Sequence, residues 1–360
     1  MTEASHQAPD RSAYAAAGVD IEAGDRAVEL MKAHVARTRR PEVLGGLGGF
    51  AGFFDASSFK GFDHPVLATS TDGVGTKVAI AQAMDKHDTI GFDLIGMLVD
   101  DLVVVGAEPL FVTDYIACGR VVPERIAAIV SGIAAACEVA GAALLGGETA
   151  EHPGLLDADE YDVAGATTGV VERAKILGPE RVVGGDVVVA LASSGLHSNG
   201  YSLVRHVLLQ QAGWTLDREI AELGTTLGEA LLTPTTVYAR DILALIEAAQ
   251  VHAISHITGG GLANNLVRVL PSGATATLRR ESWTPPAIFS LVQGVGRVSR
   301  ADIEATLNMG VGMALVAPAD SVDQLLRTAS DRGLTAWVAG EVSASSGPAR
   351  VELVGEHPTA

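Results

Sequence analysis

The sequence predicts an α/β fold of α+β-like character, arranged in two domains. A chain of 360 residues is about twice the usual length of one domain. Short aliphatic runs alternate with amphipathic segments in both halves, as strands alternate with helices. Residues 172–185 (ERAKILGPERVVGG) separate the two patterns and indicate the join. We therefore expect domains at residues 14–175 and 176–345, with a mobile N-terminus at residues 1–13 and a partly disordered tail at residues 346–360.

In the first half, apolar spacing marks the helices and aliphatic runs mark the strands. Residues 20–40 form the first predicted helix, which Pro41 ends. Residues 45–52 then form a glycine-rich turn before a short strand at residues 53–54. Two further helices are expected, one at residues 87–105 and one that begins at residue 123. The expected strands are residues 65–70, 110–117, 142–145 and 162–171. Gly146 and Gly147 are expected to end the strand at residues 142–145.

The second half repeats the alternation. Residues 186–192 form its first strand, and a serine-containing loop leads from this strand to a helix that begins near Tyr201. No short repeat occurs, which argues against a solenoid. The remaining expected elements are helices at 234–249 and 262–270 and strands at 253–256, 312–317 and 336–342.

The composition excludes several classes of protein. Lys and Arg total 25 against 43 Asp and Glu, a net charge of −18 at pH 7. This charge leaves no basic footprint for nucleic acid. The two cysteines, Cys118 and Cys137, cannot build a disulfide framework and fit buried thiols. No signal peptide is visible, and no uncharged apolar run reaches the roughly 18 residues of a membrane span. We expect a cytoplasmic protein that binds neither nucleic acid nor membrane.

The first candidate site is a strand end followed by glycines, at residues 69–77 (TSTDGVGTK). Its glycines allow a ligand to approach the backbone, whose N–H groups can form an anion nest. Lys77 supplies a positive charge, and Asp72 is an oxygen ligand of the kind that Mg²⁺ prefers. The residue order is not that of a Walker A loop. The residues alone fit equally well a tight turn with an exposed lysine.

Carboxylates cluster beyond this turn. Asp93 and Asp100 lie seven residues apart on one face of a predicted helix, and Asp101 is adjacent. Carboxylates in so apolar a helix are costly unless they are paired, cap a helix or bind metal, and we favour metal and nucleotide binding over an Arg partner. Asp114 ends a strand, and Glu148 follows two glycines, where it could bind metal or lie on an ordinary polar loop.

Two loops of the second half are candidate phosphate sites. Residues 193–202 (SSGLHSNGYS) offer hydroxyls, backbone N–H groups and a helix N-terminus, which bind phosphate without net positive charge. His197 in this loop could act as a general acid or base, although a lone loop histidine is more often surface. Residues 256–261 (HITGGG) repeat the arrangement, although glycines alone also fit a flexible turn. Together the sites indicate an ATP-dependent enzyme with a phosphorylated substrate.

These motifs resemble, in order, the phosphoribosylformylglycinamidine cyclo-ligase family, also called aminoimidazole ribonucleotide synthetases. The resemblance covers nearly the whole chain, from about residue 14 to about residue 342. It rests on STDGVGTK (70–77), DLVVVGAEPLFVTDY (101–115), GGETAE (146–151), SSGLHSNGYSLVR (193–205), HITGGGL (256–262) and NMGVGM (308–313).

The resemblance implies a reaction and an assembly. The family closes the ring of formylglycinamidine ribonucleotide to give aminoimidazole ribonucleotide in purine biosynthesis. ATP phosphorylates the amide oxygen, a nitrogen of the same molecule displaces the phosphate, and ADP and phosphate are released. The first domain is then expected to bind ATP and to pair its sheet across a homodimer, and the second to bind the substrate phosphate.

The resemblance also implies roles for single residues, with Mg²⁺ as the metal. The expected metal ligands are Asp72, Asp101 and Glu148. The expected catalytic residues are His197, His256 and Lys77. The expected ATP contacts are Gly48, Gly49, Asp72, Gly73, Gly75, Thr76, Lys77, Asp114 and Thr149. The expected substrate contacts are Ser193, Ser194, Gly195, Ser198, Asn199, Thr258, Gly259 and Gly260.

Departures and rival functions remain. Asp100 stands where the family usually has Asn, and His152, expected to be exposed, stands where Met is usual. The alternatives are a superfamily enzyme resembling thiamine-monophosphate kinase or selenophosphate synthetase, or a non-catalytic nucleotide-binding regulator. The kinase lacks the two second-half loops, the synthetase often has a reactive cysteine well before Cys118, and a regulator is expected to have lost Asp72, Asp101 or His197.

Overall fold

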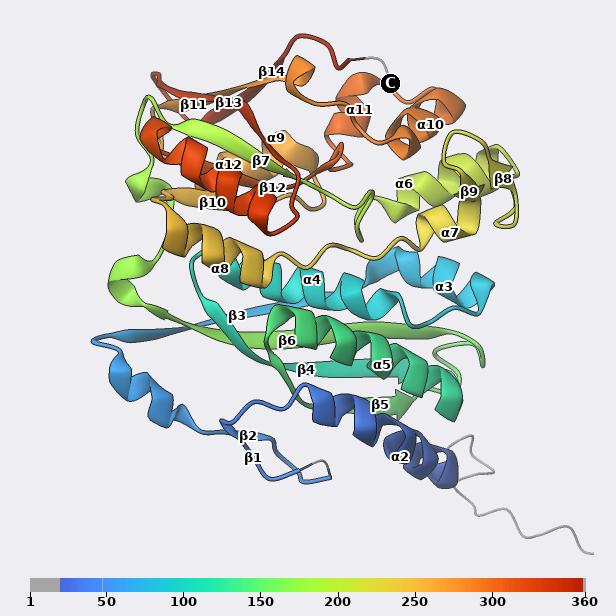
Figure 1. The fold of residues 1–360 in the computed structure, drawn as a ribbon. Coiled ribbons are helices and arrows are strands. Elements are labelled where there is room, and N and C mark those ends of the chain that lie inside the picture. The colour runs from blue at the N-terminus through green and yellow to red at the C-terminus, as the bar shows by residue number, and fades with distance from the viewer. Residues whose placement is uncertain (1–19, 47, 359–360) are drawn as a thin grey trace, which may run out of the picture.

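The computed structural model describes residues 20–46 and 48–358, and it contains two larger sheets, one above the other (Figure 1). The first half forms a four-stranded sheet of order β3-β6-β4-β5. The second half forms a six-stranded sheet of order β10-β12-β7-β13-β11-β14. The mixed α/β fold class is thereby confirmed, while the mobile segment expected at residues 1–13 lies outside the described residues. No helix in the described part of the chain is long and apolar enough to cross a membrane.

The first half begins with a helix and a small hairpin and then builds its sheet. Labels follow Figure 1. The elements are α2 (Ile21–Arg37), β1 (Val43–Leu44), β2 (Phe53–Phe54), β3 (Pro65–Gly73), α3 (Val78–Met84), α4 (Ile90–Val103), β4 (Glu108–Cys118), α5 (Pro123–Ala140), β5 (Ala143–Glu151) and β6 (Tyr161–Glu172).

The second half alternates strands with short helices. Its sheet strands are β7 (Val187–Ala192), β10 (Ala253–His256), β11 (Ala274–Arg279), β12 (Val311–Ala317), β13 (Ala336–Ala344) and β14 (Arg350–Val354). Its helices are α6 (Tyr201–Arg205), α7 (Leu227–Leu231), α8 (Ala239–Ala248), α9 (Gly261–Leu266), α10 (Ala287–Gly296), α11 (Arg300–Glu304) and α12 (Val322–Asp331), and a small hairpin is made by β8 (Glu219–Ile220) and β9 (Thr225–Thr226).

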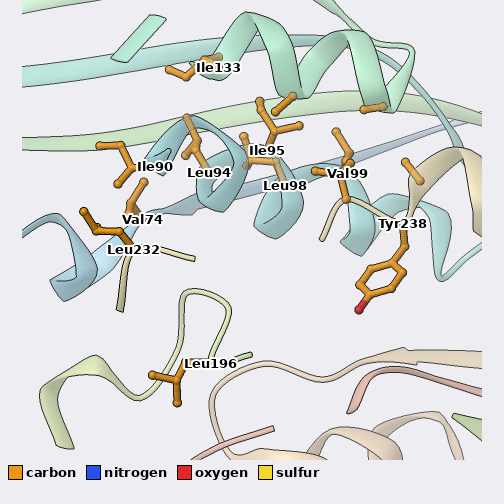
Figure 2. Packing of buried hydrophobic residues seen from close by; sticks show 14 of the residues in the cluster. Val74, Ile90, Leu94, Ile95, Leu98, Val99, Ile133, Leu196, Leu232 and Tyr238 are labelled. Atoms are coloured by element: carbon orange, nitrogen blue, oxygen red, sulfur yellow. The ribbon is translucent and has the colours of Figure 1, made fainter. Parts of the chain in front are cut away.

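Helix α4 is the shared core of the two halves. Its sequence is apolar apart from three aspartates, and all but two of its fourteen residues are buried, as expected of a helix inside the protein. Figure 2 shows its side chains between Ile133 of α5 and three residues of the second half, Leu196, Leu232 and Tyr238. A Cβ added at Gly96 would lie 2.7 Å from the Thr235 side chain, so glycine permits this close approach.

Three predictions of elements were wrong. Strand β5 does not stop at Gly146, because its parallel pairing with β4 carries it through the glycines to Glu151. Residues 234–238 are not helical, because Asp93 and Asp100 of α4 accept the backbone N–H groups of Thr235 and Tyr238. Residues 350–354, expected in a disordered tail, form β14, which pairs in parallel with β11 at the edge of the larger sheet.

The four-stranded sheet has one covered face and one face with exposed apolar side chains. Gly165 of β6 lies beneath Leu98 of α4, so this face is covered by helix. Directly opposed residues of an antiparallel pair share a face and neighbours along a strand alternate, so Leu67 and Tyr115 lie on the other face. Their exposed fractions are 60% and 42%.

Candidate active site

Asp72, Asp101 and His256 meet at the junction of the two halves. Asp72 lies near the end of β3, Asp101 in the last turn of α4, and His256 at the end of β10. The His256 Nδ1 atom lies 2.9 Å from the Asp101 Oδ1 atom. Surrounding protein, and to a smaller degree the nearby Asp101 carboxylate, raise the pKa of Asp72. Residues far apart in the sequence, and predicted separately, thus share one site.

This pair of carboxylates fits Mg²⁺ bound together with phosphate. The Asp101 side chain is 45% exposed, and Asp72 is also exposed, so both oxygens are accessible to a ligand. Within residues 20–358, apart from Leu47, no group of three or more His, Cys, Asp and Glu side chains is arranged to hold a metal. Mg²⁺ typically takes one or two carboxylates and completes its shell with phosphate oxygens and water. The donor set therefore suits a metal that arrives with a nucleotide.

Other residues predicted to bind metal or ATP lie elsewhere in this chain. Glu148 aligns with Gly73 across three strand spacings, about 14 Å, so the prediction that it completes a metal site with Asp72 was wrong for the single chain. Thr149 follows it on β5. Gly48 and Gly49 lie in the turn between β1 and β2, on the side away from the second sheet (Figure 1).

Asp114 lies under the helices rather than at the junction. Gly165 of β6 lies between Asp114 and Asp72 and pairs with both. Helix α4 covers Gly165, because Leu98 packs against it. Burial raises the pKa of Asp114 to about 7. A Cβ added at Gly147 would lie 2.0 Å from the Asp114 Oδ1 atom, which explains the glycine on the neighbouring strand. The geometry gives Asp114 a packing position and no path to the carboxylates of the site.

Lys77 is an interior cation. Its side chain is completely buried, and its Nζ atom lies 2.7 Å from Asp93 Oδ1, 3.0 Å from His197 O and 2.7 Å from Thr233 O. Three acceptors saturate the three N–H donors of an ammonium group. The prediction that Lys77 faces ATP phosphates was therefore wrong, as was the alternative of an exposed lysine. The turn that carries it, including Gly73, Gly75 and Thr76, remains beside Asp72.

His197 is a buried, neutral histidine. It has a left-handed backbone with φ of 58°, and it is 1% exposed. Its Nε2 atom accepts the Ser194 N–H at 3.1 Å, which puts the ring proton of the neutral form on Nδ1. Burial, with Lys77 and His256 nearby, lowers the pKa of His197 well below its usual value. The buried Nδ1 atom has no partner among the described residues, so its N–H is an unsatisfied donor inside the protein.

The serine hydroxyls of the same loop point into the protein. Ser193 donates to Gly195 O at 2.8 Å, Ser194 to Pro234 O at 2.6 Å, and Ser198 to Val74 O at 2.7 Å. The three hydroxyls are thus already used as donors within the protein, and the expectation that these serines contact the substrate stays a prediction. A Cβ added at Gly259 would lie 3.3 Å from Asn199 Oδ1, so the two glycine-containing loops do meet.

Two asparagines hold these loops, and the residue patterns did not single them out as supports. Asn265 Nδ2 lies 2.8 Å from Gly261 O and also donates to the carbonyls of Thr258 and Gly259. Asn308 donates to Gly195 O at 2.9 Å. The NMGVGM segment packs closely, since a Cβ added at Gly312 would lie 2.0 Å from the Tyr238 hydroxyl oxygen. Asn265 stands four residues after Gly261 on the helix that follows the glycines. This spacing was the signal from which its supporting role could have been predicted.

A cleft of ≈ 420 Å³ opens beside the Asp101–His256 pair. It is bounded by β3, the end of α4, residues 177–179, β10 and α9. Arg268 lines it, and this arginine has no carboxylate within 4 Å among the described residues. Sequence reasoning missed Arg268 because nothing local distinguishes it from a surface arginine on a helix. The polar residues that line the cleft include Thr69, Ser70, Ser255, Thr258, Asn265 and Arg268.

Comparison with known proteins identifies close relatives over almost the whole chain. The family model described as AIR synthase related protein, N-terminal domain, matches residues 55–171, and the model of the C-terminal domain matches residues 184–351. A phosphoribosylformylglycinamidine cyclo-ligase of Shouchella clausii is 53% identical over 336 residues, covering 93% of this chain and 97% of the relative. One from an Anaeromyxobacter species is 52% identical over 345 residues, covering 95% and 98%.

Solved structures share the fold at lower identity. Thiamine-monophosphate kinase from Stenotrophomonas maltophilia has a TM-score of 0.66 and 22% identity, covering 91% of this chain and 96% of that chain. The hydrogenase maturation protein HypE of E. coli has a TM-score of 0.64 and 17% identity, covering 92% and 94%. Both similarities establish the architecture alone.

Proposed function

The chain belongs to the phosphoribosylformylglycinamidine cyclo-ligase family, and from this premise we propose how its residues serve the reaction. The protein is an ATP-dependent ligase of purine biosynthesis. It converts formylglycinamidine ribonucleotide to aminoimidazole ribonucleotide with release of ADP and phosphate. The observation that carries the proposed site is the meeting of Asp72 and Asp101 with His256 across the two halves.

Asp72 and Asp101 hold Mg²⁺ with the ATP phosphates in this proposal. The metal would neutralise phosphate charge, which an acidic chain otherwise repels. His256 positions Asp101, because its Nδ1–H donates to one carboxylate oxygen and leaves the other for the metal. Donation from Nδ1 leaves His256 Nε2 as an acceptor, and this buried atom has no partner among the described residues. It is available to a proton of the substrate.

His197 acts as a neutral hydrogen-bond donor. Ring closure needs the amide oxygen, a poor leaving group, to be converted to phosphate, a good one. The Nδ1–H of His197 can stabilise negative charge that develops near the reacting carbon, and a fixed donor in a buried site needs no reorganisation. Because nucleophile and electrophile belong to one molecule, holding its conformation contributes up to about 7–11 kcal/mol.

Backbone donors and Arg268 are proposed to hold the substrate phosphate. The loop at residues 193–199 is held by the Ser198 hydroxyl and the loop at residues 258–261 by Asn265 of α9, and we propose that backbone N–H groups of both loops that are not already bonded donate to the phosphate. Arg268 lines the adjoining cleft and supplies a positive charge with hydroxyls of Ser255 and Thr258 beside it. In this proposal Asp101 lies on the side of the cleft that faces the metal, and Ser255, Thr258 and Arg268 lie on the side that faces the phosphate.

A homodimer through the first sheet is also proposed. The face that carries Leu67 and Tyr115 exposes large apolar side chains, and burying such a face against its copy removes them from water. This proposal leaves the six-stranded sheet, which has buried residues on both faces, outside the interface.

A purified-protein assay tests the site. Formation of aminoimidazole ribonucleotide from formylglycinamidine ribonucleotide is measured against ATP and Mg²⁺ for the wild type, Asp101→Asn and His256→Gln. The matched control is Asp331→Asn, an exposed carboxylate at the end of α12. We expect weaker Mg²⁺ and ATP dependence for the two site variants and no change for the control. Unaltered kinetics of Asp101→Asn would refute the metal assignment.

A further inference from the structure

The Lys77 ammonium group joins three separate parts of the chain. Its acceptors are Asp93 on α4, the carbonyl of His197 in the loop after β7, and the carbonyl of Thr233 in the segment before α8. The ammonium also lies 5.4 Å from the centre of the Tyr201 ring. Each N–H has an acceptor, so Lys77 has no donor left for a ligand. Its function has to be exerted through what it holds.

What it holds is the backbone of His197. A non-glycine residue with φ of 58° is in an uncommon conformation that the surroundings must enforce. Two contacts with the turn at residues 74–77 enforce this conformation. The Lys77 ammonium donates to the carbonyl of His197, and the hydroxyl of Ser198, the following residue, donates to Val74 O at 2.7 Å. These contacts fix the peptide on the C-terminal side of His197. The direction of the imidazole follows from that peptide and from the Ser194 N–H on Nε2.

A purely stabilising role is a weak explanation for this ion pair. Both side chains are 0% exposed. Replacing a buried ion pair with apolar residues of similar volume is often neutral or stabilising, because two charges no longer have to be removed from water. Apolar residues, however, cannot donate to the His197 carbonyl. The features that need the ammonium are the hydrogen bonds to the carbonyls of His197 and Thr233, and the first of these holds the loop.

We propose that the Lys77–Asp93 ion pair is a positioning device for His197, which fixes the loop so that the imidazole presents Nδ1–H to the reacting group. Asp93 keeps the ammonium in place and is held itself, because its Oδ1 accepts the Thr235 N–H at 3.1 Å and the Thr235 hydroxyl at 2.6 Å. The proposal rests on the proposed role of His197. It makes Lys77 a positioning residue that touches neither ATP nor substrate.

The test replaces the pair without leaving a buried charge. Lys77→Met combined with Asp93→Leu removes the donor to the loop, and Lys77→Gln combined with Asp93→Asn keeps a polar, uncharged pair. The matched control is Arg40→Met with Glu42→Leu. Arg40 is also a largely buried cation that donates to two backbone carbonyls, of Pro109 and Gly141, but in the first half away from the junction.

Three measurements are made on each variant. They are the thermal unfolding midpoint, kcat and KM for ATP, and the ¹⁵N chemical shifts of the His197 ring, assigned with a His197→Asn sample. We expect the Met–Leu variant to fold, to lose about 10–100-fold in kcat as misplaced catalytic groups do, and to keep KM for ATP within about twofold. The His197 ring resonances should shift or broaden. The Gln–Asn variant should recover part of kcat, and the Arg40 control should leave kcat unchanged.

Each outcome is decisive. A folded Met–Leu variant with wild-type kcat would overturn the positioning role. A loss of kcat with unaltered His197 resonances, or an equal loss in the Arg40 control, would overturn it as well. Failure of both double variants to fold would show that the pair serves stability and would overturn it too. If His197→Asn itself keeps full turnover, the proposed role of His197 fails first, and the ring resonances still report whether Lys77 positions the loop.

Discussion

Asp100 is predicted to lower the stability of the protein progressively as the pH rises from about 4 to about 7. Its side chain is completely buried, and both carboxylate oxygens accept the backbone N–H of Tyr238, at 3.0 and 3.2 Å. Burial raises the pKa of Asp100 from 3.8 to about 7. Asp100→Asn keeps one carbonyl oxygen for the Tyr238 N–H and removes the ionisable group.

The direction of the change in stability follows from the pH at which the unfolded and the folded chain each release the Asp100 proton. The unfolded chain releases the Asp100 proton near pH 4, and the folded chain holds it until about pH 7. The free energy of unfolding therefore falls as the pH rises between these values, by about 1.4 kcal/mol per unit and about 4 kcal/mol in all. Below pH 4 the effect is absent. Asp100→Asn removes this loss, so it should stabilise the protein by about 2–3 kcal/mol more at pH 8 than at pH 5.

Urea unfolding of the metal-free protein in chelator, at one protein concentration, measures this difference at both pH values. Asp331→Asn provides the surface control, since its side chain lies in solvent. A difference in unfolding free energy between Asp100→Asn and wild type that stays constant from pH 5 to pH 8 would contradict this prediction. A control that shows the same pH dependence would do so equally.

Three further predictions concern activity and assembly. Asp72→Asn should raise KM for Mg-ATP about tenfold or more, because Asp72 is proposed to bind the metal. The unfolding midpoint should shift by only a few degrees, because Asp72 is exposed. An unchanged KM contradicts this prediction. His197→Asn should lower kcat about 10²-fold, and calorimetry should show that ATP affinity is retained. Asparagine is chosen because it tolerates the left-handed backbone at this position. A normal kcat would remove His197 from the mechanism. Leu67→Glu should convert the proposed dimer to monomers in sedimentation experiments; a monomeric wild type, or a dimeric variant, counts against the sheet interface.

The elements that the sequence predicted well have a strong local signal. Helix α4 is apolar with a helical spacing, and α5 begins at Pro123 as expected. The segment at residues 234–238 misled the prediction because its composition suits a helix, whereas its conformation is set by two carboxylates more than 130 residues earlier. Strand β14 alternates exposed and half-buried residues at a sheet edge, so its short RVELV pattern does not stand out from a tail.

The site was predictable in its residues and not in its contacts. Resemblance to a family selected Asp72, Asp101 and His256, and the fold brings these three together. Lys77 was misassigned, because a lysine after glycines suggests a phosphate contact and its three actual acceptors lie 16, 120 and 156 residues away. Arg268 was missed, because a cleft between two domains has no sequence signature.

The contacts of α4 with residues 233–238 also bear on how the chain folds during synthesis. Asp93 and Thr235 are 142 residues apart. At roughly 5–20 residues per second, a ribosome takes about 7–30 s to make the interval between them. For that time Asp93 has Lys77 as a partner, but neither Asp93 nor Asp100 has the backbone N–H group of residues 235–238 that it accepts in the complete fold. We therefore expect the core around α4 to close only after residues 233–238 have been made.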